Sequence, residues 1–137
     1  LYVASTKASM KRINALKPDS DLLSALFEDA SKFYLGSDFT IAVSMLNLGD
    51  HEPELRQKVR LISRKHRSAV EQAWENALIG SGLSEEVART VMAITLSVYR
   101  GMIMRRFLRN DPEYTRFTLQ QWEKMARAYI AEHQTAV

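Results

Sequence analysis

The stretch over residues 91–104 constrains the fold most, because it predicts a helix that has no solvent face. Arg100 is the only charged residue among its 14 positions. A surface helix carries one apolar stripe and a polar back, whereas a helix that is apolar all round must be covered on both sides. The stretch is shorter than the roughly 20 residues that a membrane span needs, so we expect no membrane helix. One face therefore meets the chain's own core and the other meets a partner.

Helical phase divides residues 87–108 into two faces. The predicted core face carries Ala88, Val91, Met92, Thr95, Tyr99 and Met102. The opposite face carries Thr90, Ala93, Ser97, Arg100, Gly101, Met104 and Leu108. Small residues spaced four apart on this second face allow another helix to approach closely. We predict a homodimer in which the last two helices of each subunit form a four-helix bundle. Its expected contacts are Ala93, Ser97, Gly101, Met104 and Trp122; packing by the last helix of the same chain is the alternative.

The composition is that of one globular domain over residues 1–137. The net charge of +3 is too small to prove a polyanionic partner. The chain has no cysteine, which excludes disulfides and thiolate metal sites. We find no signal peptide and no lipidation motif, and therefore expect a cytoplasmic protein. Because the sequence begins at Leu1 and not at Met, we expect that a preceding segment is missing.

The pattern of apolar residues and helix-ending residues predicts an all-α fold, an antiparallel bundle of about six helices. The first is expected over residues 1–16. The second is capped by Asp19 or Ser20 and closed by Gly36, with an apolar stripe at Leu23, Leu26, Phe27, Ala30 and Phe33. A short apolar helix is expected over 38–48 and a long one over 53–79. The fifth is capped by Ser84, and the last begins at Pro112 after a cap at Asp111.

No arrangement of residues in the chain predicts catalysis. His51, His66 and His133 lack a second histidine or a carboxylate at the spacing of a helical metal site. No nucleophile elbow, Walker loop or dinucleotide-binding glycine motif is present. We therefore expect no enzyme, no metal and no cofactor.

The long helix is predicted to carry an apolar stripe at Leu55, Val59, Ile62, Ala69, Val70, Ala73 and Ala77. His66 falls within this stripe, where a polar ring needs a hydrogen bond or a ligand. We favour a core histidine satisfied within the protein, and Thr95 and Tyr99 pose the same question on the fifth helix. Together the three could be the convergent polar groups of an apolar pocket between the second, long and fifth helices. The predicted lining is Phe27, Met45, His66, Met92, Thr95, Tyr99 and Met102. The ligand expected there is a small hydrophobic or aromatic molecule with one or two polar atoms.

Six basic residues lie within residues 56–67, with no acid among them. They are Arg56, Lys58, Arg60, Arg64, Lys65 and Arg67. A phosphate-binding stripe is one interpretation. However, no aromatic residues interleave, and we favour a solvated face. This chain alone is therefore predicted to bind no specific DNA.

Three segments resemble the C-terminal regulatory domain of TetR/AcrR-family transcriptional repressors. Residues 1–4 (LYVA) resemble the start of the helix that connects the DNA-binding head to the body. Residues 47–56 (NLGDHEPELR) resemble the loop that enters the long central helix, and residues 79–83 (IGSGL) the break before the dimerising helix pair. The family's N-terminal helix-turn-helix is absent from this chain.

The resemblance implies a dimeric repressor whose body binds a small effector and whose separate head reads DNA. Effector binding would change the separation of the two heads. The chain would then be a single ligand-sensing and dimerisation domain. The alternative is an all-helical scaffold or protein-interaction domain without a ligand, in which His66, Thr95 and Tyr99 are satisfied core groups.

Overall fold

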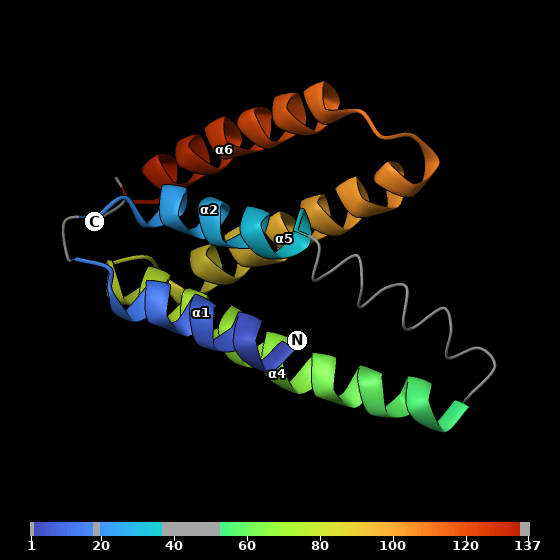
Figure 1. Cartoon of the computed structure of the whole chain (residues 1–137). Coiled ribbons are helices and arrows are strands. Elements are labelled where there is room, and N and C mark those ends of the chain that lie inside the picture. Colours follow the sequence, from blue (N-terminus) through green and yellow to red (C-terminus); the bar gives the residue numbers. More distant parts are fainter. Residues whose placement is uncertain (1, 18–19, 37–52, 135–137) are drawn as a thin grey trace.

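The computed structural model describes residues 2–17, 20–36 and 53–134, and all the regular structure within these ranges is helical (Figure 1). The helices are α1 (Tyr2–Asn14), α2 (Leu22–Tyr34), α4 (Pro53–Gly80), α5 (Glu85–Leu108) and α6 (Pro112–Gln134). The all-α prediction is confirmed. The helix expected over residues 38–48, and with it the sixth helix of the predicted bundle, lies outside the described residues.

The predicted starts of the last two helices are correct. The side chain of Ser84 accepts a hydrogen bond from the backbone N–H of Val87 (3.2 Å), which caps α5. The side chain of Asp111 accepts one from the N–H of Tyr114 (3.2 Å), and Pro112 is the first residue of α6. These bonds satisfy N–H groups that have no partner within their helix.

The predicted cap of α2 was wrong by one residue. Asp21 caps this helix and accepts from the backbone N–H of Ser24 (3.2 Å). Ser20 instead accepts from the N–H of Lys17 (2.9 Å) in the preceding turn, and Asp19 lies outside the described residues. All three side chains are good caps, so residue type alone does not choose between neighbouring positions.

The turn between α4 and α5 is set by a glycine. Gly82 has a φ of +111°, a conformation that strains any other residue. The N–H of Leu83 bonds to the carbonyl of Leu78 (3.3 Å), and that of Gly82 to the carbonyl of Ile79 (3.0 Å). This is the Schellman pattern of hydrogen bonds, which ends a helix and brings the flanking apolar side chains together.

Helix α5 has the two faces that its periodicity predicts. All six residues of the predicted core face are buried, Val91, Thr95 and Tyr99 completely. On the opposite face Thr90 is half-buried, and the other six residues are exposed. In Figure 1, α5 packs against α2, α4 and α6, while α1 lies along α4.

The buried faces of α2 and α4 were predicted with unequal success. All five residues of the α2 stripe are buried. On α4 the expected stripe was partly wrong, because Ala69 is exposed while Trp74 and Leu78 join Val70 in the core. The long helix packs against both α1 and α5, and its buried face follows these neighbours.

By length and composition, the segment Glu85–Arg106 could cross a membrane. However, 44% of its most apolar stretch is buried inside the chain, and the central helix of a folded domain meets the same criterion.

Candidate functional site

The structure places five of the seven predicted pocket residues in the core between α2 and α5. Phe27 is on α2, and the others are on α5: Met92, Thr95, Tyr99 and Met102. Met45 lies outside the described residues, as does the side chain of His66, whose backbone belongs to α4.

Tyr99 is completely buried, and its hydroxyl has partners within the chain. It donates to the backbone carbonyl of Phe27 (3.0 Å) and lies 2.6 Å from Ser31 Oγ. Its ring stacks on Tyr34 with centroids 5.5 Å apart. Burial raises the pKa of Tyr99 to about 12, because the charged phenolate is penalised away from water.

The hydroxyl of Thr95 also has a hydrogen-bond partner within the chain. Its hydroxyl oxygen accepts a hydrogen bond from the indole N–H of Trp122 on α6 (2.9 Å). Neither Thr95 nor Tyr99 therefore needs a ligand to complete its hydrogen bonding, which removes one argument for the pocket. The effector pocket itself stays a prediction.

Arg67 departs from the solvated face that its neighbours form. Lys58, Arg60, Arg64 and Lys65 are exposed, whereas Arg67 is half-buried. The side chain of Arg56 lies outside the described part of the chain. The basic run is thus a solvated face at these four positions and not at its last member.

The guanidinium of Arg67 rests on two aromatic rings of α2. Its central carbon lies 3.6 Å from the ring centroid of Phe33 and 5.5 Å from that of Tyr34. The Nε and Nη1 atoms are buried without a hydrogen-bond partner. Sequence reasoning missed this residue, although Arg67 precedes the buried Val70 and Trp74 by three and seven positions and so shares their face.

Charged side chains from α4 and α5 surround Tyr34. Burial raises the pKa of Tyr34, and nearby Glu71 adds to this, while Arg67 and Arg100 oppose it. Arg100 and Glu71 form an ion pair at 3.7 Å. This pair is neutral overall, so the charge of Arg67 is not cancelled by it.

A second buried polar group joins α1, α2 and α4. The carboxylate of Asp29 accepts hydrogen bonds from Ser9 Oγ (3.0 Å), Arg12 Nε (2.7 Å) and Trp74 Nε1 (2.9 Å). Arg12 also forms an ion pair with it. Asp29, Ser9 and Trp74 are all buried. This network attaches α1 to the body of the domain.

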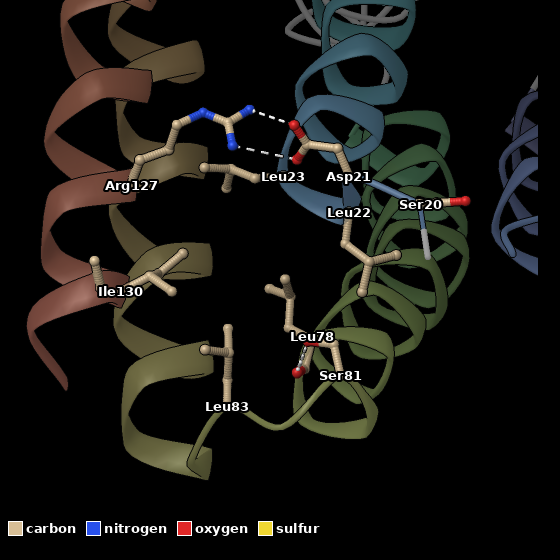
Figure 2. A pocket seen from close by; sticks show the side chains of 10 residues that line it. Ser20, Asp21, Leu22, Leu23, Leu78, Ser81, Leu83, Arg127 and Ile130 are labelled. Atoms are coloured by element: carbon tan, nitrogen blue, oxygen red, sulfur yellow. Dashed lines mark hydrogen bonds and ion pairs between the residues drawn. The ribbon is translucent and has the colours of Figure 1, made fainter. Parts of the chain in front are cut away.

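Figure 2 shows a hollow of about 440 Å³ at the end of the bundle where α4 turns into α5. Its apolar lining is Leu22, Leu23, Leu78, Leu83, Ile130 and Ala131. At its rim, Arg127 donates to both carboxylate oxygens of Asp21 (2.8 and 3.3 Å). Arg127 also bonds to Ser24 and Glu123 through Nη2. None of the five predicted pocket residues whose side chains the structure describes lines this hollow.

Four large apolar side chains of α5 and α6 are largely exposed: Leu108 (89%) and Met104 (65%) on α5, and Met125 (63%) and Phe117 (60%) on α6. Helical spacing predicts that Met125 shares one apolar face of the last helix with Leu119, Trp122, Ala126 and Tyr129, but Ala126 is buried and Met125 is exposed. We call the four exposed residues, together with Ala93, Ser97 and Gly101, the α5–α6 face.

The space above Gly101 and the position of Trp122 bear on whether a partner helix can pack on the α5–α6 face. A Cβ added at Gly101 would meet no atom within 4 Å, so the space above it is open. Trp122, the other predicted contact, is half-buried at the edge, with its indole N–H turned to Thr95.

The chain is 30% identical over 113 residues to the HTH-type transcriptional regulator CymR of Pseudomonas putida. The aligned region covers 82% of this chain and 56% of that protein, so the chain spans about half the length of this relative. The chain is related to a transcriptional regulator. This relationship supports a role in transcription regulation and favours it over an enzymatic role. No family model and no solved structure matches the chain.

Proposed function

We propose that this chain is the effector-binding and dimerisation domain of a TetR-like transcriptional repressor. The observation that carries the proposal is its relationship, over most of its length, to an HTH-type transcriptional regulator. The all-helical fold agrees with the resemblance of residues 1–4, 47–56 and 79–83 to such a domain. DNA would be read by a helix-turn-helix outside these 137 residues, in a cytoplasmic protein.

A second copy of the chain is the proposed partner of the α5–α6 face. Large apolar side chains that gather on the surface of a protein often mark a site where another protein binds. Obligate dimers bury more than about 2,000 Å² and are rich in apolar side chains. Exposed Met104 and Leu108 on α5, with Phe117 and Met125 on α6, supply such side chains on the two helices that form a hairpin (Figure 1).

The proposed effector is a small, largely apolar molecule that binds in each body. It would release the repressor only if it bound the DNA-free state better than the operator-bound state, since an equilibrium shifts by the difference in affinity. The aromatic and methionine side chains between α2 and α5 support an apolar site.

An all-helical interaction domain without a ligand is the second candidate. The internal hydrogen bonds of Tyr99 and Thr95 favour it, because both groups are satisfied by the protein itself. A thermal-shift screen of aromatic and aliphatic compounds separates the two candidates. A ligand that binds only the folded state raises the melting temperature by mass action. A reproducible stabiliser supports the effector domain, whereas a screen without one favours the interaction domain.

A further inference from the structure

Arg67 is charged, and two of its nitrogens are cut off from water without an acceptor. Nε and Nη1 are both buried and lack a hydrogen-bond partner. The guanidinium also forms a hydrogen bond with the side chain of Tyr34, but this bond does not involve Nε or Nη1, which both stay unpaired. Leaving buried donors unpaired destabilises a protein, and the penalty is larger for charged groups. Such a group calls for a reason beyond packing.

Among the described residues, the neighbours of Arg67 contact the flat face of its guanidinium, and none of them gives Nε or Nη1 an acceptor. The rings of Phe33 and Tyr34 contact the flat face of the guanidinium, as cation–π pairs do. Glu71, the described acid that acts on Tyr34, forms an ion pair with Arg100. An oxyanion at Nε or Nη1 would thus meet two donors of a charged group that are shielded from water and lack an acceptor, and charge-assisted hydrogen bonds are strongest in such a place.

The guanidinium lies next to the predicted effector site. Tyr34, on which Arg67 rests, stacks on Tyr99, and Tyr99 is 6.4 Å from Phe27 between ring centroids. Both Tyr99 and Phe27 belong to the predicted pocket lining. An aromatic cluster therefore joins the free donors of Arg67 to the apolar core between α2 and α5.

We propose that Arg67 is the group that recognises an anion in the effector site, and that the effector joins a carboxylate or similar oxyanion to an apolar body. This inference rests on the proposed function, because it names the chemical class of the effector. It replaces the solvated role that the basic run suggested for this residue.

The first test measures thermal unfolding of the 137-residue chain without ligand, for the wild type, Arg67→Met and Arg64→Met. Methionine keeps an unbranched apolar stem and removes the guanidinium with its unpaired donors. The melting temperature of Arg67→Met should be unchanged or higher by up to about 5 °C, since removing two unpaired buried donors offsets the loss of the contacts with Phe33 and Tyr34. Arg64 is exposed on the same helix, and its variant should behave as the wild type. A clear fall in the melting temperature of Arg67→Met alone would mean that the guanidinium is structural, which overturns the proposal.

The second test compares matched pairs of probes at equal ionic strength: octanoate with octanamide, and 3-phenylpropionate with 3-phenylpropanamide. At least one carboxylate should raise the melting temperature of the wild type and of Arg64→Met by several degrees more than its amide does. Arg67→Met should lose this difference and keep any response to the amide.

The outcomes separate this inference from the function on which it rests. Equal stabilisation by acid and amide, unchanged in Arg67→Met, overturns the anion and leaves an effector domain in place. No response to either carboxylate overturns the inference, whereas the broader compound screen decides the function.

Discussion

Replacing Asp29 by alanine should destabilise the domain more than any change on its surface. The substitution leaves Ser9 and Trp74, both buried, with donors that have no acceptor, and leaves Arg12 without its counter-ion. Two unpaired buried donors cost about 1–3 kcal/mol each. The Arg12 side chain is 35% exposed, so water compensates part of its loss. The free energy of unfolding should therefore fall by about 3–5 kcal/mol.

Urea unfolding followed by circular dichroism measures this change directly. The matched control is Glu28→Ala at the neighbouring position, where an exposed ion pair with Lys32 is lost and the change should stay below about 0.5 kcal/mol. Because the network joins α1 to α2 and α4, hydrogen exchange should rise most in α1. If Asp29→Ala cost less than about 1 kcal/mol, or if α1 kept its protection, the network would not attach α1 as described.

Two further predictions concern pH and DNA. Folding raises the pKa of Tyr99 to about 12, above its ordinary value near 10, so its contribution to stability is complete below pH 10 and is lost as the pH rises towards 12. Between pH 9 and pH 11.5, the free energy of unfolding should fall by up to about 2–3 kcal/mol, and by less in Tyr99→Phe. Equal losses in both proteins would contradict the assignment. The chain should bind random duplex DNA only weakly at physiological salt, with an affinity that falls as the salt concentration rises. Tight, salt-resistant binding in a fluorescence titration would show instead that the basic residues of α4 form a DNA site.

The sequence predicts those parts of the fold in which one local pattern decides the outcome. The two faces of α5 follow from helical phase alone, and Ser84 and Asp111 cap their helices as expected. The stripe of α2 was correct for the same reason. Periodicity was less informative for α4, whose buried face depends on two neighbours, so Trp74 and Leu78 were missed.

The polar groups of the interior could not be predicted, because their partners lie far away in the sequence. Asp29 bonds to residues 20 positions before it and 45 after it, and nothing local distinguishes it from an exposed acid. Arg67 was assigned to a solvated face because five other basic residues precede it, while the rings beneath it belong to α2. Only its register with Val70 and Trp74 gave a signal.

Sedimentation of the chain at micromolar concentration tests the central claim most directly, because a repressor of the proposed kind works as a dimer. We predict twice the mass of the chain for the wild type and a folded monomer, or a much weaker dimer, for Gly101→Leu. A Cβ added at Gly101 would meet no atom within 4 Å of its own chain, so we expect the effect of a leucine there to come from the partner helix. Unchanged helical content and melting of the monomer, measured by circular dichroism, is the control. A wild-type chain that sediments as a monomer at this concentration would contradict the account.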